Sequence, residues 1–187
     1  MTAGDVITLA RSVTDRPSGT IAALPDSEAL TMLAAEYPLF RRLCVGQMAS
    51  TFLSRATVEA AGSWTISPAN AQIYDVHFTI GTYREKIPRG RGVNIDADQW
   101  WQEGGTLYFS NTASRTYLVR YVAAPTAVSS TATTLDIPDE FLPAIAYRLA
   151  AVIRTRFDED PGVHVAAGIE AFERAVFTLK ANVIGVE

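Results

Sequence analysis

The sequence predicts an α+β fold in which N-terminal and C-terminal helices form a helical bundle, with a small antiparallel β-sheet or hairpin inserted in the middle. Apolar residues recur at helical spacing in the first and last thirds of the chain, whereas they alternate with polar residues in the middle third. The length of 187 residues suits one ordinary domain. We therefore expect a single domain over residues 1–187, helical at about 1–62 and 136–184 and β-rich at about 64–125.

The first third of the chain has the pattern of helices. A short helix is expected at Asp5–Ser12, and the proline and glycine of Arg16–Gly19 end it. A second helix is expected to start at Pro25–Ser27, where an aspartate or serine caps the first turn. Pro38 predicts a break or kink, because proline removes one backbone donor and crowds the preceding turn. The helical spacing then continues until Ala60–Ser63 ends it.

The middle third has the alternation of β-strands. Tyr74–Ile80 alternates apolar with polar side chains and is expected to be a half-buried strand. Two further strands are expected at Thr106–Phe109 and Thr116–Val122. The turn-like Asn111–Ser114 between them predicts an antiparallel hairpin.

The last third carries the clearest helical pattern. Pro138–Glu140 starts a helix with acidic residues near its positive end, and an apolar stripe follows along Phe141–Ile153. Asp158–Gly162 ends this helix, and a second stripe runs along Val165–Val183. The sequence therefore predicts an αα-hairpin.

Composition and charge argue against several classes of protein. The net charge is −4 and the pI about 5.2, which argues against general coating of nucleic acid or binding to anionic membranes. No run of about 18 apolar residues is present, so no transmembrane helix is expected. Charged residues make up 19% of the chain, against about 25% in typical domains. The excess of apolar surface predicts contacts with other chains.

Residues with catalytic or metal-binding chemistry are few. Cys44 lies in an apolar stretch and has no cysteine partner, so we expect an inert core thiol. His77 and His164 stand far apart in the sequence and are expected to be structural. Asp158–Asp160 lacks the ligand spacing of a calcium loop. No metal, no cofactor and no enzymatic activity are expected.

One cluster of charge stands out. Arg84, Lys86, Arg89 and Arg91 place four cations within eight residues, opposed only by Glu85. One interpretation is a solvated loop. The functional interpretation is a basic loop that meets either the carboxylates of a neighbouring subunit or the phosphates of DNA.

Three stretches carry a resemblance to a known family: Gly104–Ser110, Tyr117–Pro125 and Leu135–Ala150. In the third, a proline followed by acidic residues and an aromatic opens the penultimate helix, and a short acidic turn then leads to the last one. Over about Asp26 to Val183, the order of segments resembles the head-to-tail adaptor (connector, or head-completion) proteins of tailed bacteriophages.

The resemblance implies a structural role in the neck of the virion. Such adaptors form a ring, commonly twelvefold, that joins the portal of the DNA-filled head to the tail or nozzle protein and extends the DNA channel. Genomic DNA passes without sequence-specific binding, no membrane takes part, and assembly takes place in the host cytoplasm. A ring subunit buries both flanks, which fits the apolar composition.

Two interface hypotheses follow from the resemblance. DNA must slide through the channel, and affinity for DNA climbs with the number of cations engaged. We therefore expect the four basic residues of the 84–91 cluster to face carboxylates of an adjacent subunit or of the tail component. Val183, Ile184 and Val186 are expected to order against the portal.

Two other classes of function stay open. Asp96, Asp98 and Glu103 flank Trp100 and Trp101, and acids beside aromatic rings are typical of sugar sites. The alternative is therefore a virion- or wall-associated glycan-binding or glycosidase domain. Against it, the tryptophans are expected to cover the sheet while the acids face water. A cytoplasmic module that dimerises through its C-terminal helices is the third class.

Overall fold

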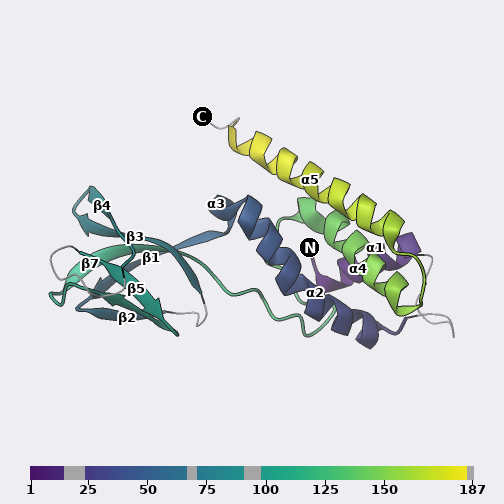
Figure 1. The fold of residues 1–187 in the computed structure, drawn as a ribbon, viewed down its shortest axis with the longest axis horizontal. Helices are drawn as coiled ribbons and strands as arrows, with labels where there is room; N and C mark the ends of the chain where they lie inside the picture. Colours follow the sequence, from purple (N-terminus) through teal and green to yellow (C-terminus); the bar gives the residue numbers. More distant parts are fainter. Residues whose placement is uncertain (15–23, 67–70, 91–97, 185–187) are drawn as a thin grey trace. The chain divides into compact units, whose positions relative to one another are not determined.

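The computed structural model describes residues 1–14, 24–66, 71–90 and 98–184. The chain divides into two compact units (Figure 1). Met1–Met48 and Pro125–Glu187 form the helical unit, and Ala49–Ala124 forms the β unit. A single domain over residues 1–187 stays a prediction.

The helical unit is built from α1 (Ala3–Thr14), α2 (Asp26–Gln47), the 3-10 turn η1 (Asp139–Phe141), α4 (Leu142–Arg156) and α5 (Gly162–Ile184). The central helix is α4, which packs against α1, α2 and α5. Its inward face, which includes Ile145, Leu149 and Ile153, is fully buried. The expected αα-hairpin is present as α4 and α5, which lie side by side (Figure 1).

The starts of α1 and α2 follow from the local sequence. Thr2 and Asp5 form a reciprocal cap on α1: Thr2 N donates to Asp5 Oδ2 at 2.7 Å, and Asp5 N donates to Thr2 Oγ1 at 3.2 Å. The second helix begins directly after Pro25, whose carbonyl accepts a hydrogen bond from Glu28 N at 3.1 Å. It then runs on through Pro38, because buried apolar residues on both sides fix the helix by tertiary packing.

Three phenylalanines from three elements join the helices. Phe40 of α2, Phe141 of η1 and Phe172 of α5 contact one another, with ring centroids separated by 5.4, 5.8 and 6.1 Å. These separations lie within the range that aromatic pairs prefer. Phe141 is fully buried at the centre of this aromatic cluster, whereas Phe172 is half-buried.

Two antiparallel sheets make up the described part of the β unit. The larger sheet has the order β1 (Leu53–Ala60), β7 (Arg115–Val122), β3 (Gln72–Ile80) and β4 (Tyr83–Ile87). The smaller sheet has the order β2 (Ser63–Thr65), β6 (Thr106–Phe109) and β5 (Trp100–Glu103). The short helix α3 (Ala49–Phe52) precedes β1, whose first residue, Leu53, pairs with Val122 at the end of β7.

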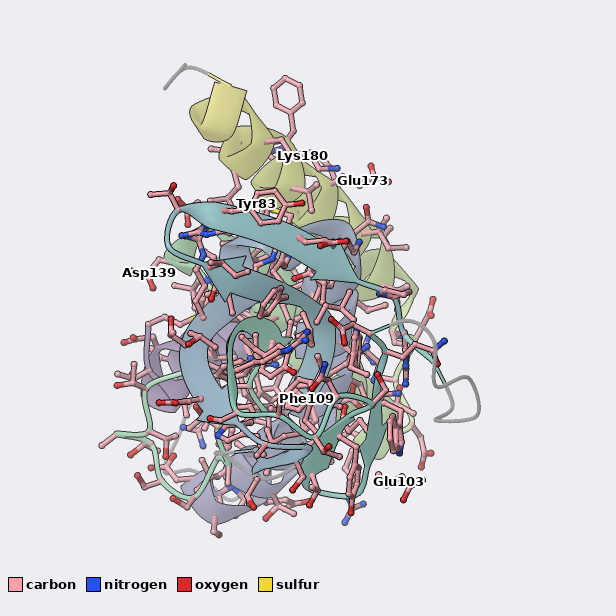
Figure 2. All side chains as sticks on the ribbon, turned by 90° about the vertical axis from the view of Figure 1, so that its left-hand side faces the viewer. Tyr83, Glu103, Phe109, Asp139, Glu173 and Lys180 are labelled. Carbon is pink, nitrogen blue, oxygen red and sulfur yellow. The ribbon has the colours of Figure 1, made fainter. Side chains whose placement is uncertain are left out.

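One apolar core is shared by the two sheets. Val119 of the larger sheet and Leu107 of the smaller sheet are both fully buried in it. The rings of Phe109 and Tyr117 stack with centroids 3.9 Å apart, which ties β6 to β7. Glu103, at the end of β5, is exposed on the outside of the unit (Figure 2).

The predicted helical bundle with a small hairpin insertion is wrong, although the α+β class fits. Strands extend from Leu53 to Val122 and form two sheets instead of one hairpin. Leu53–Ala60, which was expected to be helical, is β1. In this strand Ala56, Val58 and Ala60 point towards the core at every second position.

The predicted pairing of Thr106–Phe109 with Thr116–Val122 is also wrong. These segments are β6 and β7, which belong to different sheets. Hairpins instead join β3 to β4 and β5 to β6. Gly81 and Gly104 make these turns at positive φ, 59° and 55°, which glycine adopts without steric cost.

Candidate functional site

The outer face of the larger sheet carries a group of cations. Arg84 and Lys86 lie on β4, and Lys86 pairs in register with His77 of β3. On the neighbouring strands, Arg120 of β7 pairs with Arg55 of β1. Directly opposed residues of antiparallel strands share a face. The segment interpreted as a basic loop is therefore partly a strand, and it contributes to a basic sheet face made of Arg55, Arg84, Lys86 and Arg120.

A buried carboxylate anchors this basic sheet face. Asp75 of β3 is only 2% exposed and accepts two hydrogen bonds from Arg120, one of them from Nε at 2.6 Å. Burial alone would raise the pKa of Asp75, but the hydrogen bonds and charge of Arg120 outweigh it and hold the pKa below its usual value. The negative charge of Asp75 therefore neutralises the positive charge of Arg120. Within the described part of the chain, no carboxylate forms an ion pair with Arg55, Arg84 or Lys86.

The four predicted basic residues do not form one cluster. Arg89 leaves the sheet face, and its guanidinium lies 5.4 Å from the centre of the Trp100 ring, a cation–π contact. Arg91 lies outside the described residues. Sequence reasoning missed Arg55 and Arg120, which join the face only through strand register. In the sequence, Arg55 and Arg120 each alternate with residues that face the core, and this alternation could have identified them as members of the outer face.

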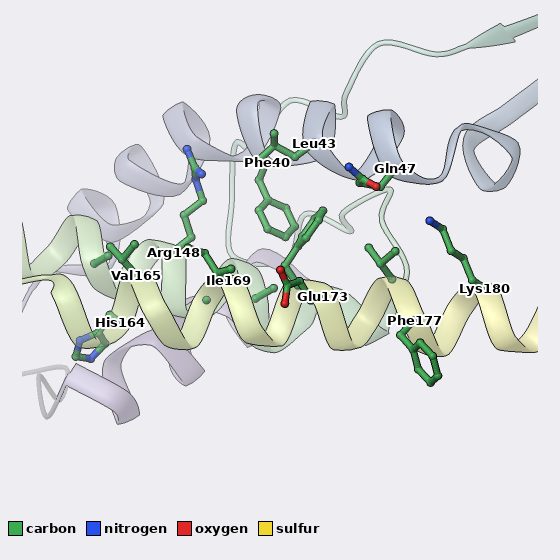
Figure 3. A pocket seen from close by; sticks show the side chains of 15 residues that line it. Phe40, Leu43, Gln47, Arg148, His164, Val165, Ile169, Glu173, Phe177 and Lys180 are labelled. Atoms are coloured by element: carbon green, nitrogen blue, oxygen red, sulfur yellow. The ribbon is translucent and has the colours of Figure 1, made fainter.

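The helical unit contains a long apolar groove between α2 and α5, with α4 as its floor (Figure 3). Its volume is about 560 Å³. Leu43 of α2 and Ile169 of α5 project into this α2–α5 groove from opposite sides and are 51% and 57% exposed. Small residues form its floor, including Ala144 and Ala151 of α4. A groove lined in this way suits the apolar side chains of a protein partner.

The predicted portal-contact residues lie at the C-terminal end. Val183 and Ile184 belong to the last turn of α5. Their side chains, and all of Val186, lie outside the described residues.

The residues of the glycan alternative do not converge on one site. Trp100 is buried, and its Nε1 donates to the carbonyl of Ile87 at 3.1 Å. Trp101 stacks on Tyr108 with centroids 5.4 Å apart. Asp98 is paired with Arg115 at 2.6 Å. Asp96 lies outside the described residues, and Glu103 is exposed on β5.

The two histidines and the acidic turn contact other groups of the fold, as expected for residues with a structural role. His77 Nε2 lies 3.4 Å from Asp75 Oδ1, and His164 Nε2 lies 3.0 Å from the carbonyl of Val13. Asp160 accepts a hydrogen bond from Gly162 N at 2.8 Å, which helps to start α5. The residues that the structure describes contain no cluster of three or more His, Cys, Asp or Glu side chains suited to a metal.

We expect Cys44 to be unreactive in the folded protein. Its side chain is fully buried in α2, and burial raises the pKa of the thiol to about 12. Since the thiolate is the reactive form, a thiol-specific chromogenic reagent near neutral pH should modify Cys44 at least about 100-fold more slowly than an exposed cysteine. Leu43→Cys supplies a matched exposed thiol on the same helix. Equal rates at the two positions would contradict the buried placement.

None of the described helices combines the length and apolar character needed to cross a membrane. A family model described as "SU10 adaptor protein" matches residues 1–182, and so covers elements of both units. No curated protein matches the chain.

Proposed function

Since the chain belongs to the SU10 adaptor protein family, a family of bacteriophage head-tail adaptors, we propose that its copies form a ring that joins the portal to the tail and extends the DNA channel. The match over residues 1–182 carries this proposal. It confirms the resemblance predicted from the sequence. An adaptor role, a place in the virion and contacts with other phage head or tail proteins follow from the family.

Assembly into a ring is supported by the apolar surface of the helical unit. A ring subunit contacts a neighbour on each flank, so it needs two interfaces that a monomer would leave in water. The α2–α5 groove and the low fraction of charged residues, 19%, are consistent with such burial. We propose a twelvefold ring in the virion neck, assembled in the host cytoplasm, with a structural role and no cofactor.

The two units of the adaptor are proposed to meet different partners. Val183, Ile184 and Val186 would contact the portal. Arg84, Lys86, Arg89 and Arg91 would contact carboxylates of an adjacent subunit or of the tail or nozzle protein.

The charge of the two units supports a protein partner for the basic residues. The β unit has seven Lys and Arg against six Asp and Glu, whereas the helical unit has nine against fourteen. The cations of the basic sheet face can give register and specificity with an acidic partner, and the small basic excess of the whole β unit avoids a strongly cationic collar around moving DNA. DNA would pass without sequence-specific contacts, and no membrane is involved.

Reversing two charges on the basic sheet face tests this contact. The double variant Arg84→Glu with Lys86→Glu should lower the yield of tailed particles at least about tenfold, because like charges would then face each other across the contact. Both side chains are exposed, so the fold should be unchanged by circular dichroism. Particles are counted by electron microscopy and titre.

A matched control is Arg42→Glu, which reverses an exposed arginine on α2. It should leave the yield unchanged. A wild-type yield from the double variant would reject the protein contact. A reconstruction of the virion neck that showed no ring of this chain would reject the ring itself.

A further inference from the structure

We infer that the α2–α5 groove receives the outer side of α5 from a second copy, in a head-to-tail contact between neighbouring subunits. This inference rests on the proposed ring and names the surfaces through which it would close. The outer side of α5 is called the α5 ridge and consists of Val163, Glu170, Arg174 and Phe177.

The groove and the α5 ridge lie on different sides of one helix. At about 100° per residue, the four ridge residues point within about 30° of one direction. Val165, Ile169 and Val176, which line the groove, point about 130° away from it. Phe177 lines one end of the groove, but its ring is turned away from Phe40 and Leu43, as Figure 3 shows.

Both surfaces leave large apolar side chains in water. On the ridge, Val163 is 77% and Phe177 is 76% exposed, and in the groove Ile169 is 57% exposed. Within the described helical unit, α4 and η1 pack against α5 but leave these side chains exposed. Large exposed apolar side chains on a surface mark a site of contact with another protein.

A second copy of this chain covers both surfaces, whereas one foreign helix covers one. In a closed head-to-tail ring, each subunit gives its α5 ridge to one neighbour and its groove to the other. A two-fold dimer centred on either surface would pair that surface with itself and leave the other in water. Two exposed surfaces on separate sides of α5 therefore suit cyclic assembly.

The charges near the two surfaces are compatible with this contact. The ridge carries Glu170 and Arg174, which form an exposed ion pair at 2.7 Å. The rim of the groove carries Glu173 and Lys180, which flank its apolar lining. Each surface therefore has one charge of each sign, so opposite charges can meet across the contact.

Cross-linking of two single-cysteine variants tests the contact. Ile169→Cys places a thiol in the groove, and Phe177→Cys places one on the ridge. The two proteins, one of them carrying a tag, are mixed at high concentration and treated with a short bifunctional maleimide. The native Cys44 is buried and contributes little. The mixture should give mixed dimers at least about tenfold more than either variant alone gives dimers.

Leu39→Cys is the matched control, because Leu39 is 47% exposed on α2 and does not line the groove. It should give only background dimers with either partner. Efficient dimers from Ile169→Cys alone or Phe177→Cys alone would indicate a two-fold contact and overturn the inference.

Native mass spectrometry of the same samples separates this inference from the proposed function. Rings that form without the mixed cross-link overturn the groove–ridge contact and leave the ring standing. If the mixture yields neither rings nor mixed dimers, the groove–ridge contact is overturned as well. The ring in the virion is then judged by reconstruction of the neck alone.

Discussion

Replacing Phe141 with alanine is expected to lower the free energy of unfolding of the helical unit by about 3–5 kcal/mol. The side chain is fully buried and contacts Phe40 and Phe172, which come from two different helices. Its removal leaves a cavity where α2, α5 and η1 meet, and it also removes two favourable aromatic contacts. The helices that carry the α2–α5 groove would lose their common anchor.

The positions of the tryptophans allow the two units to be followed separately. Trp64, Trp100 and Trp101 all belong to the β unit, so tryptophan fluorescence reports on that unit. Far-UV circular dichroism reports mainly on the helical unit. In a urea titration, Phe141→Ala should shift the circular dichroism transition and leave the fluorescence transition in place.

The control for this prediction is Phe177→Ala, which removes the same side chain from an exposed position. It should change the free energy of unfolding by no more than about 0.5 kcal/mol. A loss below about 1 kcal/mol for Phe141→Ala would contradict the central role of the aromatic cluster.

Replacing Arg120 with alanine is expected to destabilise the β unit by about 3 kcal/mol, because it leaves the buried carboxylate of Asp75 without its partner. The value lies at the low end for a broken buried pair, since the Arg120 side chain is 31% exposed. Urea titration followed by tryptophan fluorescence measures the loss.

The contribution of Asp75 to the pH dependence of stability should also change sign. In the wild type the pKa of Asp75 is below its unfolded value near 3.9. Its contribution to stability is therefore present above about pH 4 and is lost as the pH falls through the lower, folded-state pKa. Without Arg120, burial is opposed only by the weaker effects of His77 and Lys86, and we expect it to raise the pKa of Asp75. The contribution of Asp75 to stability should then be most favourable at acidic pH and be lost as the pH rises through that raised pKa.

Arg55→Ala is the matched control, because Arg55 lies directly opposite Arg120 and its side chain is exposed. Removing one of two opposed like charges should change stability by less than about 0.5 kcal/mol and preserve the wild-type pH dependence. The same pH slope in Arg120→Ala and the wild type would show that the pair does not control the titration of Asp75.

The helices were predictable from the sequence because the apolar residues that form their buried faces recur at short, regular spacing. Along α4 and α5, apolar residues at helical spacing contact each other across one short turn, so the pattern and the partner lie close together in the chain. The strand β1 was not predictable in this way. Its inward residues are small, and it is fixed by pairing with β7, whose residues lie far along the chain.

The surfaces were predictable only in part, for a similar reason. The density of cations marked Arg84 and Lys86, but Arg55 and Arg120 reach the same face through register between distant strands. The apolar stripe of α5 predicted only the αα-hairpin with α4. In the structure, its Ile169 remains more than half exposed, because it lines the groove between α2 and α5.

The pairing of Leu53 with Val122 gives the β unit a modular character. The chain enters this unit before β1 and leaves it after β7, and these strands are neighbours, about 5 Å apart. Entry and exit are thus close together, and a short peptide would bridge them. The β unit is an insertion cassette between α2 and the C-terminal helices. A change in the length or content of this cassette would therefore leave the packing of the helical scaffold in place.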